Sequence, residues 1–436
     1  KPTSTSINYG IYNAGNGNIN TESTNILISG SIDTSYKYYG IYMYNTGKLH
    51  LINTSINGYQ YGIYSNGDAS INMESGTITA TNTGIYNEYG QSDIGVLNGS
   101  SPKINGTSIG MYTKGGIISL NNGTVSSDDI GIQNSCSKLC STSKIDINGG
   151  TISGKTGIET YAILNINDGV VKGVTNGAYV HSAVFKLLNG TITTSGLNSK
   201  GIYISGGTTE ITGGTIKTTG NKSNGIYSHG ILNVSNATIT TTGDDSNGIY
   251  SSGTTNISDA KIIASGYENN GLNLSGGNLN INSGSIEGYR GLYINSGKAT
   301  ITGGEIRANS FGIYSSDNSL ATVTLGVKDK VVDTENPKIV SNLSGIDGSL
   351  YLNYYDGVIT GSSNLSFDAI VKDYEEGYDI NTHVNKENEN LTDTILAKTT
   401  LENFGEVAEV DGVKYPSVKL AVDSISDSND DVKVIK

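Results

Sequence analysis

Residues 62–86 read GIYSNGDASINMESGTITATNTGIY, which is one full interval between two copies of the tripeptide Gly-Ile-Tyr. Identical or degenerate copies recur along the chain, mostly 20–26 residues apart, and we count 15 of them from Gly10 to Gly345. A fixed interval of this length is typical of a solenoid, in which each repeat buries its apolar face only by stacking on its neighbours. The repeat therefore predicts the fold.

Each interval contains three short apolar segments. The first is Gly-Ile-Tyr, the second alternates apolar and polar residues as in residues 164–167 (LNIN), and the third resembles residues 76–78 (GTI). The segments are bounded by Gly, Asn, Asp and Ser, which favour turns. Residues 1–366 show no helical periodicity. We therefore predict an all-β fold, a right-handed parallel β-helix over residues 1–366 with about 15 rungs and three short strands per rung.

The copies of the tripeptide also indicate which side chains face outward. The middle position is apolar in all 15 copies, so we expect it to point into the column. The next position is Tyr in 11 copies and Gln133, Glu159, Asn273 or Asp347 in the others. Burying an unpaired charge is costly, so a position that accepts a carboxylate faces solvent. The two-residue alternation of a strand gives the same answer.

These outward tyrosines are the candidate ligand-binding residues. Equivalent residues in neighbouring turns lie about 4.8 Å apart, so the rings are predicted to form ladders. An exposed aromatic face suits binding of sugar rings or another partner, whereas rings that stack on one another would stiffen the column. The sequence leaves both interpretations open. The members are Tyr12, Tyr42, Tyr64, Tyr86, Tyr112, Tyr179, Tyr203, Tyr227, Tyr250, Tyr293 and Tyr314.

Two further features concern the corners between strands. Asn224, Asn247 and Asn270 occupy the same corner of three successive repeats, which predicts hydrogen bonds between their amides along the axis. The interval from Gly312 to Gly345 is lengthened by a charged stretch, residues 327–337, which we expect to form a side loop.

Composition excludes several classes of partner. The net charge of −13 and the pI near 4.8 provide no basic surface for nucleic acid or an anionic membrane. No apolar run approaches the roughly 20 residues of a membrane helix. The chain begins inside the repeat pattern and without Met, so we expect it to be a fragment of a longer protein.

The sequence predicts no metal site and no cofactor. Its four histidines are far apart in the sequence, and no Asp-rich loop has the spacing of a calcium site. Scattered Asp residues are the one candidate for calcium. The two cysteines, Cys136 and Cys140, have a spacing that fits either a small disulfide ring or two free thiols.

The repeat fades near Phe367, and residues 367–410 are predicted to be an exit or capping segment with a short strand at residues 394–397. Asp411-Gly412 suits a hairpin turn. Residues 416–425 have the apolar spacing of a helix, and residues 432–435 are strand-like.

Several segments resemble the repetitive surface proteins of Gram-positive gut bacteria. They are the repeated GIY and GTI segments, NPKI (336–339), YDGVITG (355–361), EGY (376–378) and GVKYPSVKLAV (412–422). The resemblance implies right-handed β-helices of pectate-lyase-like architecture, arrayed in tandem on secreted or cell-surface chains. It also implies an extracellular location at the bacterial surface, adjacent modules of the same chain as partners, and residues 411–436 as the cap helix and first strand of a following module.

Polysaccharide lyases and hydrolases share this architecture, so the sequence was tested for their chemistry. A lyase requires an acidic cluster and a basic residue on one face, but neither Arg290 nor Arg307 is surrounded by acidic residues in neighbouring rungs. An inverting hydrolase requires carboxyl groups roughly 6.5–9.5 Å apart, and the acidic pairs 128–129 and 244–245 do not align with each other or with His229. Because a fold alone confers no activity, we predict that the chain is not an enzyme.

The expected function is that of a structural or adhesive module of a bacterial cell-surface protein. It would act as a stalk or as an adhesin that contacts host or bacterial glycans or proteins along the tyrosine ladder. The alternatives are a carbohydrate-active module that binds or cleaves polysaccharide, and a trimeric phage fibre.

Overall fold

The computed structural model describes residues 8–13, 17–21, 26–29, 38–44, 46–96, 99–136, 141–181, 183–316, 321–328, 336–365, 369–374, 394–397, 408–410 and 413–415. These residues form strands, turns and loops, and they contain no helix. The chain divides into two compact units, Lys1–Ile231 and Leu232–Lys436. Strand β25 (Ile231–Ser235) contains the boundary between them.

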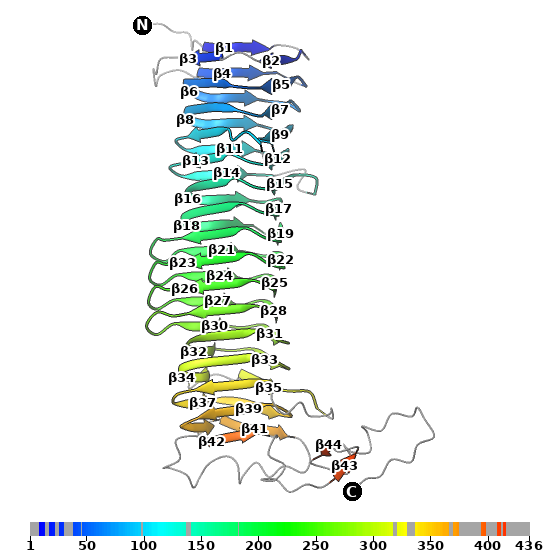
Figure 1. Ribbon diagram of the computed structural model, residues 1–436, viewed down its shortest axis with the longest axis vertical. Helices are drawn as coiled ribbons and strands as arrows, with labels where there is room; N and C mark the ends of the chain where they lie inside the picture. Colours follow the sequence, from blue (N-terminus) through cyan, green and yellow to red (C-terminus); the bar gives the residue numbers. More distant parts are fainter. Residues whose placement is uncertain are drawn as a thin grey trace, which may run out of the picture. The chain divides into compact units, whose positions relative to one another are not determined.

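In unit 1 the strands lie one above another from β1 to β24 (Figure 1). The tripeptide copies lie in β1 (Asn8–Asn13), β4 (Tyr38–Met43), β6 (Thr54–Ser65), β8 (Gly76–Asn87), β11 (Ile109–Thr113), β14 (Ile130–Asn134), β16 (Thr151–Thr160), β18 (Val170–Val180), β21 (Lys200–Ile204) and β24 (Asn224–Ser228).

The second wall of unit 1 consists of β2 (Ile19–Thr21), β5 (Lys48–Leu51), β7 (Ser70–Met73), β9 (Gln91–Ile94), β12 (Ile117–Leu120), β15 (Lys144–Ile147), β17 (Ile163–Ile166), β19 (Ala183–Leu187) and β22 (Gly207–Ile211). The third segment forms β3 (Ile26–Ser29), β10 (Lys103–Gly106), β13 (Thr124–Ser127), β20 (Thr191–Thr194) and β23 (Thr215–Thr218), and otherwise the first part of β6, β8, β16 and β18. All pairings within the unit are parallel, as in the match of Ile63 with Ile85.

Unit 2 repeats this arrangement. Its tripeptide strands are β27 (Asn247–Ser251), β30 (Asn270–Leu274), β32 (Ser285–Ile294), β34 (Glu305–Ser315), β37 (Ser344–Gly348) and, beyond the last copy, β40 (Ser363–Leu365). The second wall is β28 (Thr254–Ser258), β31 (Asn278–Ile281), β33 (Lys298–Ile301), β35 (Ala321–Leu325), β38 (Leu350–Tyr354) and β41 (Ala369–Tyr374). The third segment forms β26 (Thr238–Thr241), β29 (Lys261–Ala264), β36 (Lys338–Ser341) and β39 (Val358–Gly361). The predicted parallel β-solenoid is confirmed.

The number of strands per turn differs from the prediction in one respect. In β8 the third segment and the following tripeptide form one continuous strand, with seven positions between the inward Ile78 and Ile85. Ten positions separate Ile192 and Ile202, and there β20 and β21 are distinct strands joined by a loop. The same spacing of seven also occurs between distinct strands, as from Ile104 in β10 to Met111 in β11, so a turn has two strands or three according to the conformation of this corner.

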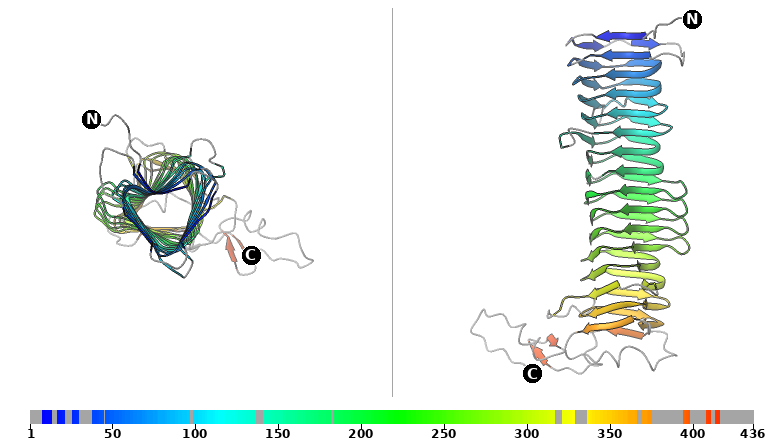
Figure 2. Two further views of the ribbon diagram at one scale, coloured as in Figure 1. Left: turned by 90° about the horizontal axis from the view of Figure 1, so that it is seen from above. Right: turned by 180° about the vertical axis from the view of Figure 1, so that it is seen from behind.

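The interior is filled by the middle residues of the segments. Seen end-on, the strands of each unit trace a closed outline (Figure 2), and the inward side chains such as Ile85, Ile202 and Ile313 have no exposed surface. Burial of an aliphatic side chain of this size contributes roughly 1.5–3 kcal/mol. The chain thus builds its core from a few residues per turn.

The glycine of the tripeptide is required by close approach between turns. A Cβ atom on Gly84 would lie 2.5 Å from the carbonyl oxygen of Gly110 and 2.5 Å from Cγ2 of Ile104. A Cβ on Gly271 would lie 2.4 Å from Cγ2 of Ile286 and 2.7 Å from the oxygen of Gly291. A closely packed interior does not absorb such overlaps without displacing backbone. The tripeptide therefore begins with glycine for packing reasons.

The chain beyond residue 366 continues the solenoid before leaving it. β41 pairs in parallel with β38, so parallel stacking runs past the predicted boundary to Tyr374. The strand predicted at residues 394–397 is present as β42 (Thr394–Ala397) and pairs antiparallel with β39. β43 (Ala408–Val410) and β44 (Val413–Tyr415) pair antiparallel, and the boundary predicted at residue 411 lies between these two strands.

Three predicted elements cannot be compared with the structure. The predicted helix at 416–425, the strand at 432–435 and most of the side loop at 327–337 lie outside the described residues. Within the described part of the chain, no helical segment capable of crossing a membrane occurs.

Gly271→Ala is expected to lower the free energy of unfolding by about 1–3 kcal/mol, because the added methyl group overpacks the contact between turns. Gly276→Ala is the matched control, since a Cβ there meets only the Ser296 hydroxyl at 3.5 Å. Chemical denaturation of both variants measures the difference. Equal stability of the two variants would contradict the close approach at Gly271.

Candidate functional site

The predicted tyrosine ladder is continuous at the beginning of unit 1. The ring centroids of Tyr12 and Tyr42 are 5.4 Å apart, and those of Tyr42 and Tyr64 are 5.3 Å apart. The spacing narrows to 4.6 Å from Tyr64 to Tyr86 and 4.6 Å from Tyr86 to Tyr112, where the rings are stacked. The in-register pairing of β1, β4, β6, β8 and β11 places these residues opposite one another.

A second column of tyrosines runs beside the first, and the sequence analysis missed it. Tyr9 stacks on Tyr39 at 5.6 Å, and Tyr39 stacks on Tyr61 at 5.4 Å. Tyr39 also contacts Tyr42 of the first column at 5.1 Å and is only 6% exposed. The sequence does contain a signal for this second column. Residues 9–12, 39–42 and 61–64 each read YGIY, so a tyrosine precedes the glycine of the tripeptide in these three copies.

Packing in these columns changes the acidity of the phenols. Burial, with a smaller contribution from neighbouring phenols, raises the pKa of Tyr42 to about 12. Burial likewise raises the pKa of Tyr39, Tyr61, Tyr64 and Tyr86 above the ordinary value. The ladder is therefore a neutral, partly desolvated aromatic surface near neutral pH.

The second predicted ladder, also in unit 1, is shorter. Tyr179 and Tyr203 stack at 4.5 Å, whereas Tyr203 and Tyr227 meet edge to face at 5.3 Å. The Lys200 ammonium lies 6.0 Å from the Tyr203 ring centroid and 5.8 Å from that of Tyr227. Stacking and cation–π contact both stabilise such an arrangement.

A histidine that the sequence did not single out as a site residue extends this ladder. The imidazole of His181 lies 3.9 Å from the Tyr161 ring and 3.8 Å from the Tyr179 ring. Its Nε2 is 3.1 Å from the Glu159 carboxylate, which occupies the ladder position of its own turn. Glu159, which stands where most copies of the tripeptide have tyrosine, therefore contacts the end of this aromatic column.

The third ladder, in unit 2, is built around an arginine. Tyr293 and Tyr314 stack at 5.6 Å, and the Arg290 guanidinium carbon lies 6.0 Å and 5.3 Å from their centroids. Phe311 stacks on Tyr314 at 5.1 Å. Tyr250 pairs in register with Asn273, so the aromatic column does not continue from it into β30.

Amide ladders accompany the aromatic ones. Asn270 Nδ2 donates to Asn247 Oδ1 at 2.8 Å, which confirms the predicted bond for this pair. Asn224 belongs to the other unit. Asn256 donates to Asn233 and Asn280 donates to Asn256, each at 2.7 Å, along another wall of unit 2.

Arg307 has two acidic neighbours, one on its own strand and one in the adjacent turn. Arg307 forms a 2.7 Å ion pair with Glu305, and Glu287 is its register partner in the adjacent turn. Residues two apart on a strand share a face, which is why Glu305 reaches Arg307. The Arg307 side chain is 54% exposed, so this is an ion pair at the surface.

The described residues contain no group of three or more His, Cys, Asp or Glu side chains arranged to hold a metal ion. The acidic pairs at 128–129 and 244–245 are exposed corner residues. Cys136 is disulfide-bonded. The chain's other cysteine, Cys140, lies outside the described residues.

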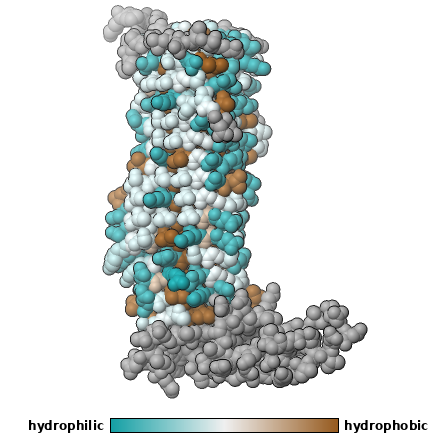
Figure 3. Space-filling view, in the orientation of Figure 1, coloured by the Kyte–Doolittle hydropathy of each residue, from teal (hydrophilic) through white to brown (hydrophobic). Residues whose placement is uncertain are grey.

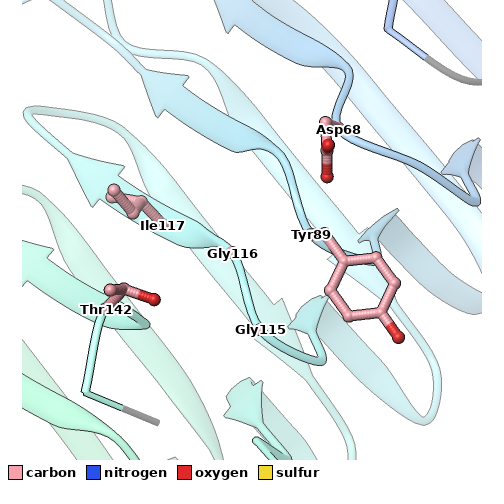
Figure 4. Close-up of a pocket in the computed structure, with 6 residues that line it drawn as sticks. All are labelled: Asp68, Tyr89, Gly115, Gly116, Ile117 and Thr142. Atoms are coloured by element: carbon pink, nitrogen blue, oxygen red, sulfur yellow. The ribbon is translucent and has the colours of Figure 1, made fainter. Parts of the chain in front are cut away.

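A hollow of about 400 Å³ opens on unit 1, and none of the candidate residues predicted from the sequence lines it. It lies where successive turns pass their corners before β7, β9, β12 and β15. Figure 4 shows Asp68 and Tyr89 on one side and Ile117 and Thr142 on the other, with the backbone of residues 115–116 between them. On the face seen in Figure 3, apolar side chains occur singly or in small groups.

No protein-family model, curated protein or solved structure matches this chain. The geometry of the chain itself therefore carries the functional conclusions.

Raising the pH tests whether the ladder tyrosines are packed. The pKa of Tyr42 is about 12 in the folded chain, against an ordinary value of 10.0. Below pH 10 both states are protonated and stability is unaffected, whereas above it the unfolded chain ionises first and stability falls. Absorbance at 295 nm should show phenol ionisation at higher pH in folded than in denatured protein. Coincident titration curves would contradict the packed ladder.

Proposed function

We propose that the chain is a structural module of a bacterial cell-surface protein, whose tyrosine ladders hold successive turns of a β-solenoid together. The observation that carries this proposal is the 4.6 Å stacking of Tyr86 on Tyr64 and on Tyr112. Both faces of the Tyr86 ring are covered by tyrosines, so a sugar ring has no free face of Tyr86 on which to stack. Aromatic pairs of this kind contribute about 0.5–1.5 kcal/mol beyond their area of burial.

Several other features support a structural role over an enzymatic one. Ion pairs such as that of Lys186 with Glu210 at 2.9 Å, and that of Arg307 with Glu305, lie at the surface. Amide ladders in both units add hydrogen bonds along the stacking direction, for example from Asn148 to Asn121 at 2.8 Å in unit 1. The Lys186–Glu210 and Asn148–Asn121 contacts connect adjacent turns, and the Arg307–Glu305 contact lies within one turn.

Two parts of this proposal rest on the resemblance to repetitive surface proteins. They are the location at the cell surface and the contact with neighbouring modules of the same chain. An adhesive contact to host or bacterial glycans is the second candidate. It is favoured by Tyr12, whose ring is 51% exposed at the start of the first ladder.

Variants of Tyr203 separate the two roles. Tyr203→Ala is expected to lower the free energy of unfolding by about 1–3 kcal/mol, because it removes one stacked and one edge-to-face contact. Tyr203→Phe keeps the ring and should stay within about 0.5 kcal/mol of the wild type. Tyr267→Ala is the exposed control, since its ring is 66% exposed and outside the ladders.

The same proteins are then applied to a glycan and mucin array. A structural ladder predicts that Tyr203→Ala, while still folded, binds every array component as the wild type does. Loss of a saturable wild-type signal in Tyr203→Ala, with its stability unchanged, would assign the ladder to ligand binding instead.

A further inference from the structure

The hollow beside Tyr89 has a rigid floor made of stacked corners. The backbone amide of Gly115 donates to the Glu88 carbonyl at 2.9 Å, and that of Ile117 donates to the Gly90 carbonyl at 3.1 Å. A Cβ atom on Gly116 would lie 2.1 Å from the Gly90 oxygen, so only glycine fits there. The floor is therefore preformed, which lowers the entropic cost of binding.

The aromatic wall of the hollow is held in position by an ion pair. Lys114 Nζ lies 3.0 Å from the Glu88 carboxylate and 5.7 Å from the Tyr89 ring centroid. Hydrogen bonds to Glu88 and Tyr89 raise the pKa of Lys114, so its ammonium stays charged. Unlike the ladder rings, the Tyr89 ring has no described aromatic ring stacked on it, and Tyr89 is 37% exposed.

The opposite wall of the hollow presents an apolar side chain at a position where the adjacent turns have polar residues. Ile117 occupies an outward position of β12, and its register partners in adjacent turns are Gln91 and Lys144. An apolar side chain at a solvent-facing position contributes nothing to the core of the solenoid. It does give a bound molecule a second apolar contact across from Tyr89 (Figure 4).

The charge of the hollow limits what it can bind. Glu88 and Lys114 neutralise each other, whereas Asp68 has no ion-pair or hydrogen-bond partner among the described residues. Its carboxylate repels an anion and accepts hydrogen bonds from hydroxyl groups. A small cation would satisfy Asp68 but leave Tyr89 and Ile117 unused, whereas a pyranose ring presents hydroxyl groups at its edge and C–H groups on its faces.

We propose that this hollow binds a neutral hexopyranose, whose C–H face stacks on Tyr89 while its hydroxyl groups donate to Asp68 and its far side contacts Ile117. No ladder tyrosine lines this site, so the proposal does not depend on the structural role of the ladders. A pocket of this size, mostly apolar with a few polar groups, is typical of small-ligand sites.

Saturation-transfer NMR with the intact chain tests the site, using methyl β-D-glucopyranoside, methyl β-D-galactopyranoside and methyl glucuronoside as separate probes. At least one neutral glycoside is expected to bind with a millimolar dissociation constant, and more tightly than the anionic glucuronoside. Tyr89→Ala and Ile117→Ser should each weaken it about tenfold, which corresponds to 1.4 kcal/mol. Asp68→Asn should weaken it less, because the amide keeps one acceptor.

Two controls keep the result decisive. Tyr89→Phe retains the ring face and should keep the affinity within about threefold, and Tyr267→Ala should change nothing. Circular dichroism confirms that each variant is folded. The proposal is overturned by absence of transfer to both neutral glycosides, by preferential binding of the glucuronoside, or by undiminished binding in folded Tyr89→Ala.

Discussion

In-register parallel pairing between equivalent residues of successive turns is the constraint on which the rest of each unit depends. It is enforced where the backbone of one tripeptide approaches the next so closely that Gly84 or Gly271 has no room for a Cβ atom. A shift by one residue would place isoleucines outside and tyrosines inside. The glycine, the isoleucine and the tyrosine therefore act together, as contact point, core residue and outer residue.

The ladders follow from this pairing. Once turns are in register, any residue repeated at one position meets its own copies about 4.8 Å away. Tyrosines then stack, asparagines exchange amide hydrogen bonds, and a replacement such as Glu159 comes to lie beside Tyr179 and His181. The ladders add stability in the direction in which a solenoid is otherwise held only by backbone hydrogen bonds and its thin core. The hollow at Tyr89 differs because its side chains do not repeat from turn to turn.

The sequence was sufficient to predict what the repeat encodes, namely the parallel solenoid, the inward isoleucines and the outward tyrosine positions. It did not reveal the second column of Tyr9, Tyr39 and Tyr61, because the residue before the glycine is tyrosine in only these three of the 15 copies. The ion pair of Arg307 was missed because it involves Glu305 on the same strand. The hollow could not be predicted from the sequence, because Asp68, Tyr89 and Ile117 come from corners of different turns and no sequence motif connects them.

The central claim is that the ladder tyrosines stabilise one another. A double-mutant cycle on Tyr64 and Tyr86, whose rings lie 4.6 Å apart, measures that interaction directly. Alanine at each position and at both, compared by chemical denaturation, should give a coupling free energy of about 0.5–1.5 kcal/mol. The cycle of Tyr86 with Tyr203, which shares no contact with it, should give zero within error. A coupling of zero between Tyr64 and Tyr86 would contradict the structural role of the ladder.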